Sequence, residues 1–302
     1  MKYNRIYFLD SGRTIGMCSF GALEKLDTFS GLKVVFYFLP GNVWAKNFWK
    51  WARRFHTNQR KSIYKLIVCT NELSEWAYLR SCGISAIYAN QNMLCNEHKF
   101  FVEEAKPQKL FDAVYAAALA PFKRLHLVEE LRSLFVVTYK VGTNVYDLHQ
   151  EYPGLSHVSF NRSFLGSPEV RHLYNQSRCG LALSRREGAM WASMEYQLCG
   201  LPVVSTKSRG GRFKYYDEDF WIVAQPSRHR VRIAVQNALK LTISPDEIRC
   251  RTLEKMAAER KRFYRMGAQL AEKYGAGNFL PYDSIFGGEG IDGNSSRLPD
   301  CP

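Results

Sequence analysis

The sequence predicts an α/β protein made of two Rossmann-like domains. Short apolar runs of strand length alternate with segments in which apolar residues recur at helical spacing, an order typical of βαβ units. The strand runs are apolar almost throughout, as expected for parallel strands buried on both faces of a sheet. The length of 302 residues suits two modest domains of this kind.

The composition supports well-filled cores and anionic partners. Hydrophobic residues make up 46% of the chain and aromatic residues 14%. No run of about 18 apolar residues occurs, so no membrane-spanning helix is predicted, and Asp10 interrupts the first apolar run, which favours a strand over a signal peptide. The cysteines form no C-x-x-C pair, which favours free thiols in a reducing cytoplasm and predicts no metal site. The net charge of +14 favours a nucleotide, phosphate, lipid headgroup or nucleic acid as partner.

Residues 1–107 are predicted to form the N-terminal domain. The loop over residues 10–16 contains Gly12 and is expected to lead into a helix that ends near Leu26. A glycine in a first βα loop can approach a phosphate, but the full G-x-G-x-x-G pattern is missing, and a plain tight turn explains the loop equally well. Further helices are expected over 43–56 and 72–81, and four strands over 5–9, 33–39, 64–70 and 85–89.

A second domain is predicted over residues 108–276, after a polar linker over 90–109. It begins with a strand at Phe111, then a loop and a helix that ends at Leu134. Later strands are expected over 135–140, 181–183, 201–204 and 221–223, with helices over 170–177 and from 187 to 198.

The closing helix of this domain has the clearest boundaries. Ser244 is expected as N-cap, Pro245 as the first helical residue and Glu247 as the partner in a capping box, while Gly275 follows the last turn. Residues 277–302 are rich in Gly, Ser and Asp, and are predicted to be a loosely ordered tail.

Residues 179–206 are the most informative stretch. A strand leads to Glu187, where a helix is predicted to begin, and Gly200-x-Pro202 ends that helix before a second strand. Glu187 would lie just past the carboxyl end of a parallel strand, where open α/β sheets bind their ligands. The first amides of the helix, at Gly188, Ala189 and Met190, would bind phosphate there.

Glu195 follows Glu187 by eight residues, which corresponds to about two helical turns, or roughly 12 Å. That span suits a nucleotide sugar, with one carboxylate at the phosphate end and the other deeper. The alternative is that Glu187 caps the helix and Glu195 is solvated. The spacing alone does not separate these two interpretations.

The same stretch resembles the signature of retaining glycosyltransferases of family 4. The pattern is E-x7-E followed by C-G-L-P-V-V-S-T, and it extends through Gly210 and Gly211 at the spacing of that family. The resemblance covers residues 111–239 well and the N-terminal third only loosely. It implies the GT-B fold, in which two Rossmann-like domains face a cleft, here with a shortened N-terminal domain on the acceptor side.

The resemblance also implies a metal-independent, hexosyltransferase-like enzyme without a cofactor other than its nucleotide-sugar co-substrate, a UDP- or GDP-sugar. Lys123 would be catalytic by neutralising charge on the leaving diphosphate. Glu187 would be catalytic by orienting the transferred sugar, and Glu195 would accept hydrogen bonds from the ribose. The remaining donor-binding residues would be Gly188, Ala189, Met190, Arg124, Gly166, Gly210, Gly211 and Gly12.

The sequence departs from the family at one of the two cationic residues that hold the donor diphosphate in that family. Ala118 stands where the family has an arginine, and Arg124, Arg185 or Arg186 would have to substitute for it. Lys123 and Arg124 also admit a simpler interpretation, a basic helix start on a solvated face.

Two other functions compete with transfer of a sugar to a glycan or lipid-linked glycan. A catalytically inactive GT-B module that binds nucleotide sugars is favoured by Ala118 and by the short N-terminal domain. A nucleic-acid-binding protein is favoured by charge alone. We expect no nucleic acid partner, because the basic residues are concentrated in one segment.

That segment predicts contact with an anionic membrane. Residues 28–71 contain no Asp or Glu and eight Lys or Arg. The helix predicted within it has an apolar stripe and a basic face, with Trp49 off the stripe. Either the stripe packs on the sheet and the basic residues are solvated, or residues 43–61 bind an anionic surface. The second interpretation predicts a protein that is peripheral on the inner face of the membrane. Together with the resemblance to family 4, it implies a cytoplasmic enzyme of polysaccharide or cell-envelope biosynthesis.

Overall fold

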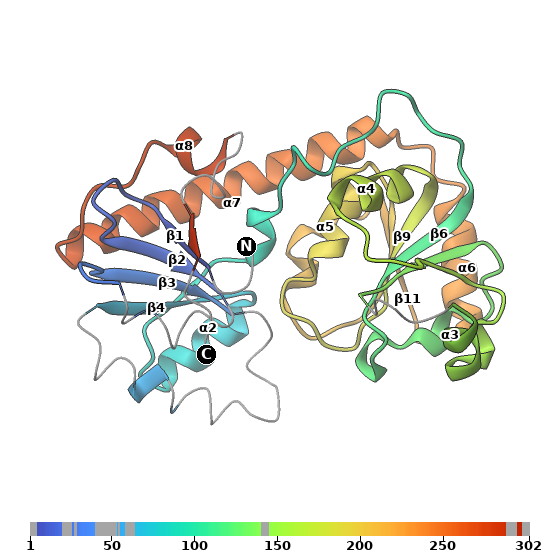
Figure 1. The fold of residues 1–302 in the computed structure, drawn as a ribbon, viewed down its shortest axis with the longest axis horizontal. Coiled ribbons are helices and arrows are strands. Elements are labelled where there is room, and N and C mark those ends of the chain that lie inside the picture. Colours follow the sequence, from blue (N-terminus) through green and yellow to red (C-terminus); the bar gives the residue numbers. More distant parts are fainter. Residues whose placement is uncertain are drawn as a thin grey trace. The chain divides into compact units, whose positions relative to one another are not determined.

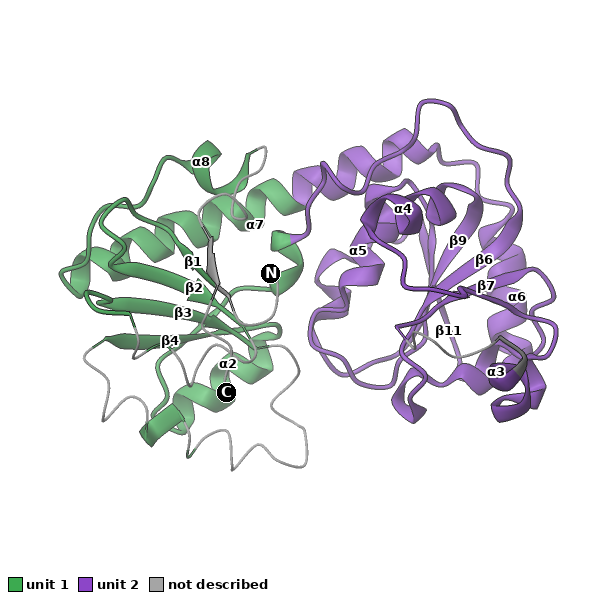
Figure 2. Cartoon of the chain, viewed as in Figure 1, with its two compact units in different colours: residues 1–94, 256–302 green, residues 95–255 purple. Residues whose placement is uncertain are grey.

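A computed structural model describes residues 5–19, 26, 29–39, 53, 55–57, 64–139, 145–287 and 295–297. The chain divides into two compact units, which we call unit 1 (residues 1–94 and 256–302) and unit 2 (residues 95–255), as Figure 2 shows. Each unit contains one six-stranded sheet with helices packed against it (Figure 1). The predicted α/β class is therefore confirmed.

The sheet of unit 1 is parallel except at one edge. Strands β2 to β5 pair in parallel, whereas β1 pairs antiparallel with both β2 and β12. In spatial order the strands are β12 (Ser295–Arg297), β1 (Arg5–Phe8), β2 (Ile15–Cys18), β3 (Val34–Phe38), β4 (Lys65–Thr70) and β5 (Ala86–Tyr88).

The two faces of this sheet pack against different elements because successive side chains of a strand point to opposite sides. Phe36 and Phe38 of β3 contact Phe263 of the long helix α7 (Pro245–Lys273), with ring centroids 5.4 and 5.6 Å apart. Tyr37 points to the other face and contacts Phe55 at 5.5 Å. Helix α2 (Leu73–Ser81) contributes Leu79 to the core on that face.

The predicted βα loop at residues 10–16 is wrong, because the chain forms an antiparallel hairpin there. The carboxylate of Asp10 accepts hydrogen bonds from the amides of Thr14 and Ile15 at 3.1 and 2.8 Å, and from the Thr14 hydroxyl at 2.7 Å. These bonds fold the chain back, so that β2 follows where the start of a helix was expected. Gly12 lies in this hairpin turn rather than at the start of a helix, and the argument for it as a phosphate-binding residue is lost.

The sheet of unit 2 is parallel throughout. In spatial order its strands are β11 (Trp221–Ala224), β10 (Val203–Thr206), β9 (Ser177–Ala182), β6 (Phe111–Ala116), β7 (Leu134–Val137) and β8 (Ser159–Phe160). Its helices, besides the first part of α7, are α3 (Val145–Glu151), α4 (Ser167–Asn175), α5 (Trp191–Leu198) and α6 (Arg228–Ala238). The helix predicted to end at Leu134 is instead two short 3₁₀ turns, Pro121–Lys123 and Leu125–Val128.

The predicted boundaries of the closing helix are confirmed in α7. The Ser244 hydroxyl accepts a hydrogen bond from the amide of Glu247 at 3.1 Å. At the other end Gly275 has a φ of 65°, and the amides of Gly275 and Ala276 bond the carbonyls of Glu272 and Ala271 at 3.0 and 2.9 Å. This is a Schellman motif, in which a left-handed glycine closes the last turn.

The division into units differs from the predicted boundaries at 107/108 and 276/277. It falls at 94/95 and within α7, at 255/256. The first part of α7 is tied to unit 2, where Arg249 donates to the carbonyls of Phe100 and Leu198 at 2.7 Å each. The second part carries Phe263, which packs on the sheet of unit 1.

The described part of the predicted loose tail, residues 277–287, is packed. The amide of Leu280 bonds the carbonyl of Leu9 at 2.7 Å. The short helix α8 (Tyr282–Phe286) buries Ile285 and Phe286. These residues complete unit 1 rather than trail from unit 2.

The segment predicted to contact a membrane lies almost entirely outside the described residues. Of the helix expected over 43–56, only Arg53, Phe55 and His56 are described, and all three are helical. Among the described helices, none combines the length and the apolar composition needed to cross a bilayer.

Candidate functional site

The candidate residues of unit 2 gather where three neighbouring strands end. Strands β10, β9 and β6 are adjacent and parallel, so the loops that follow Thr206, Ala182 and Ala116 lie at one edge of the sheet. This is the edge at which open α/β sheets bind their ligands. These loops carry Lys123 and Arg124, the run from Arg185 to Met190, and the run from Lys207 to Gly211.

Lys123 and Glu187 form an ion pair at this edge, between the loops after β6 and β9. The Lys123 ammonium donates to Oε1 of Glu187, and the Ser184 hydroxyl donates to Oε2. The side chains of Lys123 and Glu187 remain 9% and 18% exposed, so each can still be reached from solvent. The Tyr115 hydroxyl, on β6, donates to the carbonyl of Lys123 and holds that turn in place. The structure therefore brings together the two residues predicted to be catalytic.

A fully buried arginine stands behind this pair. Arg212 donates to the Ser184 hydroxyl at 2.9 Å, to the Thr206 carbonyl at 2.8 Å and to the Ser184 carbonyl at 3.2 Å. Burial lowers its pKa to about 10, against the opposing effect of the Glu187 charge, so Arg212 stays charged at neutral pH. Arg212, Ser184, Glu187 and Lys123 thus form one hydrogen-bonded chain. The sequence argument did not select Arg212, whose sole signal is its place directly after the glycine pair.

Glu187 does not begin a helix, contrary to the prediction. Helix α5 starts at Trp191, and Met190 before it has a left-handed φ of 59°. The amide of Glu187 instead bonds the carbonyl of Arg209, at 3.0 Å. Glu187 and Glu195 are therefore not two turns apart on one helix, and Gly188, Ala189 and Met190 belong to a buried loop before α5 rather than to its first turn.

The two glycines after β10 allow the loops to approach this closely. Gly210 has a φ of 125°, and a Cβ there would lie 1.4 Å from the carbonyl oxygen of Glu187. The amide of Gly211 bonds the carbonyl of Gly188 at 2.6 Å. The predicted importance of this glycine pair thus has a structural cause, the contact between the β9 and β10 loops.

Helix α5 is fixed against the sheet by Tyr196. Its hydroxyl accepts a hydrogen bond from the amide of Ala116 at 2.7 Å, and its ring covers Gly180 of β9. A Cβ at Gly180 would lie 2.2 Å from that ring. The position of α5, and with it Glu195, therefore depends on a glycine in the neighbouring strand.

Glu195 lies on α5 and makes its contact with α4. The Tyr174 hydroxyl donates to its carboxylate at 3.0 Å. Burial raises the pKa of Glu195 to about 7, and the bond from Tyr174 opposes that shift without cancelling it. Glu195 is therefore only partly ionised at neutral pH.

The loop that contains Gly166 follows β8. Asn161 holds its start, accepting from the Thr138 amide at 2.7 Å and donating to the carbonyls of Thr138 and Ser163 at 2.9 and 2.8 Å. Gly166 is the residue before α4, and Phe164 is 63% exposed. Asn161 thus anchors the start of the loop, and Phe164 presents an aromatic ring to solvent.

Arg124 lies beside this set in a strongly cationic cavity. The cavity measures about 290 Å³ and is lined by Arg124, Arg185, Arg186, Lys207, Ser208 and Arg209, a set that we call the cationic cavity. Arg124 has a left-handed φ of 55° and donates to the Thr206 hydroxyl at 3.3 Å. Burial, and next the charge of Arg185, lower the pKa of Arg124. The three arginines suggested as substitutes for the missing one are thus all present around one space.

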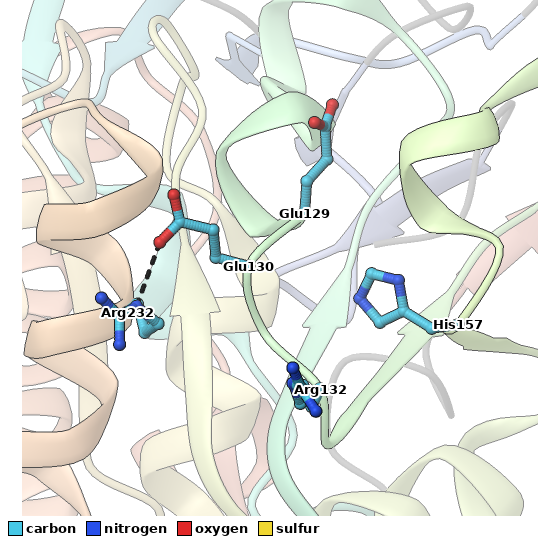
Figure 3. A pocket seen from close by; sticks show the side chains of 5 residues that line it. All are labelled: Glu129, Glu130, Arg132, His157 and Arg232. Atoms are coloured by element: carbon cyan, nitrogen blue, oxygen red, sulfur yellow. Dashed lines mark hydrogen bonds and ion pairs between the residues drawn. The ribbon is translucent and has the colours of Figure 1, made fainter.

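A second cavity in unit 2, of about 600 Å³, has mixed charge (Figure 3). Its lining includes Glu130, whose carboxylate pairs with Arg232 at 3.0 Å, and Glu129, which pairs with Arg228 at 2.9 Å. Arg132 and His157 complete the lining, and His157 Nε2 lies at hydrogen-bonding distance, 3.0 Å, from the carbonyl oxygen of Leu131. Because its carboxylates already neutralise neighbouring arginines, this cavity offers no excess charge to a ligand.

No three His, Cys, Asp or Glu side chains in the described parts of the chain are grouped as metal ligands would be. The carboxylates of the one Asp-x-Asp motif are engaged with α7. Asp219 pairs with Arg251 at 2.6 Å and Asp217 with Lys255 at 2.8 Å. This motif therefore has a structural use.

No family model matches the sequence, and no curated protein is similar to it at the sequence level. Solved structures do share its fold. Sucrose-phosphate synthase from Thermosynechococcus elongatus matches over 86% of this chain and 73% of its own, with a TM-score of 0.60 and 13% identity. HepE from Anabaena in complex with UDP matches over 80% and 72%, with a TM-score of 0.57 and 15% identity.

A glycosyltransferase from Rickettsia africae matches over 80% of this chain and 77% of its own, with a TM-score of 0.53 and 10% identity. Because these sequence identities are only 10–15%, the likeness establishes a shared fold and nothing further. It confirms the GT-B fold that the sequence resemblance implied.

Proposed function

We propose that this chain is a retaining glycosyltransferase of the family 4 type, which moves a sugar from a nucleoside-diphosphate sugar to a hydroxyl of a glycan or lipid-linked glycan. The observation that carries the proposal is the Lys123–Glu187 ion pair, placed at the carboxyl ends of parallel strands in a GT-B fold. The fold neighbours support a UDP-sugar as donor, since HepE has been solved with UDP, with UDP and glucose, and with UDP-glucose.

In the proposed reaction, the bond between the anomeric carbon and the diphosphate oxygen breaks. A bond forms from the acceptor oxygen to the same carbon, on the same face, and the hydroxyl proton passes to the leaving diphosphate. Lys123 stabilises the charge that develops on that diphosphate, a role that needs no metal. Glu187 accepts hydrogen bonds from the hydroxyls of the transferred sugar.

The other donor contacts follow from the loops around this pair. The loop over Gly188, Ala189 and Met190 and the glycine pair Gly210–Gly211 border Glu187, close to the phosphates and the sugar. Glu195 is assigned to the ribose hydroxyls. The exposed ring of Phe164, beside Gly166, offers a face on which the nucleobase can stack.

The first test is binding of the bare nucleotide. UDP, GDP and ADP are added separately in a thermal-unfolding assay, and one of them is expected to raise the melting temperature, because a ligand that binds only the folded state must do so. If none of the three shifts the melting temperature at millimolar concentration, the donor site is refuted.

Two matched substitutions then separate the roles of the carboxylates. Glu187→Gln is expected to abolish transfer and leave nucleotide affinity nearly unchanged, because Glu187 is assigned to the sugar. Glu195→Gln is expected to weaken nucleotide binding by about 1–2 kcal/mol through a lost charged hydrogen bond. Calorimetry with the nucleotide checks both, and equal losses in the two variants would contradict the assignment.

The second candidate is a GT-B module that binds nucleotide sugars without transferring them. Its grounds are Ala118, where a cation is missing, and the short N-terminal domain. The two candidates differ in turnover: an active enzyme slowly hydrolyses UDP-glucose or its GDP counterpart without an acceptor, and Lys123→Gln abolishes this. Nucleotide binding without any donor cleavage would favour the inactive module.

The sequence of residues 43–61 further supports a proposal of peripheral attachment to the inner face of a membrane. The protein is expected to sediment with vesicles that contain phosphatidylglycerol, less so as salt is raised, and not with neutral vesicles. A folded Lys50→Glu/Arg53→Glu/Arg54→Glu variant should lose this binding. Equal binding to both kinds of vesicle, or none, removes the membrane from the proposal.

A further inference from the structure

Tyr174 is a buried tyrosine of α4 to which the proposed reaction gives no role. Its side chain is fully buried, and its hydroxyl donates a hydrogen bond to Oε2 of Glu195 at 3.0 Å. Glu195 is the residue assigned to the ribose, so Tyr174 is one hydrogen bond away from a proposed ligand contact.

The Glu195 carboxylate is held at one oxygen only. Within the described residues, the Tyr174 hydroxyl is the sole hydrogen-bond donor to this carboxylate, and no lysine or arginine pairs with it. A carboxylate can accept about four hydrogen bonds through its two oxygens. Glu195 is partly exposed, so its remaining acceptor sites can be reached by a ligand.

Tyr174 is fixed by its own packing. Its ring meets the Tyr196 ring edge-on, with centroids 4.9 Å apart, and stacks on the Phe100 ring at 6.1 Å. Asn175, the next residue, donates to the Phe101 carbonyl at 3.0 Å and so ties this end of α4 to the segment that carries Phe100. The Tyr174 hydroxyl is therefore held in one position before any ligand binds.

The backbone of Glu195 is also fixed, and the Tyr174 bond completes the placement of its side chain. The hydroxyl of the next residue, Tyr196, accepts a hydrogen bond from the Ala116 amide at 2.7 Å and anchors α5 to the sheet. A free glutamate side chain has several rotamers, and selecting one of them on binding costs conformational entropy. The Tyr174 bond restricts the side chain when the protein folds, so less entropy is lost when a ligand binds.

The same bond favours the form of the carboxylate that accepts hydrogen bonds best. Burial raises the pKa of Glu195 to about 7, and the Tyr174 hydroxyl acts in the opposite direction because it bonds the ionised form. An ionised carboxylate accepts from hydroxyl groups more strongly than a protonated one. Placement and charge thus both prepare Glu195 to accept from hydroxyl donors.

We propose that Tyr174 is the positioning residue through which this site selects a ribonucleotide donor. It holds Glu195 as an acceptor for the two ribose hydroxyls and does not touch the nucleotide itself. This inference rests on the proposed function, which assigns Glu195 to the ribose. Tyr174 makes and breaks no covalent bond and keeps its proton throughout.

The test compares UDP with 2′,3′-dideoxyuridine diphosphate, which lacks both ribose hydroxyls. If the thermal-unfolding assay selects GDP or ADP, that nucleotide and its dideoxy form are used instead. Calorimetry on the full chain measures both affinities, and the original protein is expected to prefer UDP at least about tenfold. Tyr174→Phe is expected to weaken UDP binding about three- to tenfold and to leave the dideoxy nucleotide unchanged, because only the ribose contact is lost. A residue that only stabilised the fold would weaken both nucleotides equally, and that result would overturn the inference.

Tyr264→Phe is the matched control. It removes a tyrosine hydroxyl that donates to the Leu280 carbonyl, also at 3.0 Å, in unit 1. Binding of both nucleotides should be unchanged, and an equal loss of the preference for UDP in Tyr264→Phe would contradict a role for the Glu195 contact. Thermal unfolding checks that each variant folds, and binding of the dideoxy nucleotide reports an intact site.

A double substitution tests whether Tyr174 acts through Glu195. Glu195→Ala removes the acceptor and is expected to abolish the preference for UDP. Adding Tyr174→Phe should then cause no further weakening of UDP binding, because the two residues act as one unit. If the two losses add, Tyr174 acts by another route and the inference is overturned.

Failure of the inference and failure of the proposed function give different results. If the original protein prefers UDP and Tyr174→Phe keeps that preference in full, the inference alone is overturned. If the original protein binds UDP and its dideoxy form equally, the assignment of Glu195 to the ribose falls and the inference falls with it. If it binds no nucleotide, the donor site itself is refuted, together with the inference.

Discussion

The two sheets of this protein use the polar residues at their strand ends in opposite ways. In unit 1, after β4, the Asn71 side chain donates to the Leu39 carbonyl at 3.0 Å and accepts from the Gln91 amide at 2.9 Å. Glu75 accepts from the Asn71 amide at 3.0 Å, and Asn90 donates to the Asn71 carbonyl at 3.0 Å. Polar side chains and backbone groups satisfy one another here.

In unit 2 the equivalent edge carries charge that faces a cavity. Lys123 and Glu187 remain accessible, and the cationic cavity contains no carboxylate. The difference teaches that the two edges differ in what the polar groups do: those of unit 1 bond the backbone and stabilise the fold, whereas Arg185 and Arg209 of unit 2 have no carboxylate partner in the described residues and contribute little to stability. The predictions below test this contrast by where a substitution lowers stability, in unit 1 or in unit 2, and by how much.

The largest effect is expected at the glycine that joins the loops of the site. Gly210→Ala cannot keep the present structure, because the added Cβ would overlap the Glu187 carbonyl at 1.4 Å. The backbone bonds between these loops, from Glu187 to Arg209, from Arg209 to Arg185 and from Gly211 to Gly188, are then disrupted, and we expect the free energy of unfolding to fall by about 4 kcal/mol or more. Hydrogen exchange should show lost protection in unit 2 and not in unit 1.

Gly275→Ala is the matched control in unit 1. Gly275 also has a positive φ, 65°, but its surroundings are open. The cost should be about 1 kcal/mol, from backbone conformation alone. If Gly210→Ala and Gly275→Ala lower the free energy of unfolding by similar amounts, close contact between the β9 and β10 loops is not what makes Gly210 sensitive.

The next largest effect is expected at the buried cation. Arg212→Met removes the guanidinium that donates to the carbonyls of Ser184 and Thr206, and it removes a buried charge near Glu187. We expect the free energy of unfolding to fall by about 3 to 4 kcal/mol. Arg209→Met, an exposed cation of the cationic cavity, should change stability by less than about 0.5 kcal/mol. Urea unfolding followed in unit 2 checks both, and a loss at Arg209 as large as that at Arg212 would contradict the contrast.

A smaller effect is expected in the polar network of unit 1. Asn71→Ala removes a donor and an acceptor that two buried backbone groups require, at a cost of about 2 kcal/mol. Exchange protection should fall in β4 and β5. Ser81→Ala, an exposed hydroxyl at the end of α2, is the control and should be near neutral.

The smallest effect is a pH dependence from Glu195. Its pKa is raised to about 7 in the folded protein, so the folded state holds its proton more tightly than the unfolded state. This stabilisation is lost as pH rises from the unfolded pKa toward and past 7, and solvent at the partly exposed Glu195 reduces its size. Glu195→Gln should flatten the stability of unit 2 between pH 5 and pH 8 relative to the original protein.

The same carboxylate gives a signature of ligand binding. Ribose hydroxyls donate best to an ionised carboxylate, so nucleotide binding should lower the pKa of Glu195 and release protons near pH 7. Calorimetry in buffers of different ionisation enthalpy measures this release. Proton uptake, or release that persists in Glu195→Gln, would contradict the assignment to the ribose.

Local signals in the sequence were enough to predict most elements and the edge of the sheet that carries the site. The caps of α7 lie within a few residues of its ends, and the apolar runs of the parallel strands are continuous, so each can be recognised without knowing what it packs against. Lys123, Glu187 and the glycine pair come after predicted strands, so their place at the carboxyl edge of the sheet can also be recognised from the local sequence.

The tertiary structure decided how those residues meet. The backbone amide of Glu187 donates to the Arg209 carbonyl instead of lying in a first helical turn, because Gly210 lets the β10 loop come into contact with the β9 loop. Tertiary contacts also decide three other features that local sequence does not show. These are the β1–β2 hairpin, the packing of residues 277–287 on unit 1 and the burial of Arg212. The cationic cavity draws on three loops between Arg124 and Arg209, and only the parallel order of β10, β9 and β6 brings their charges together.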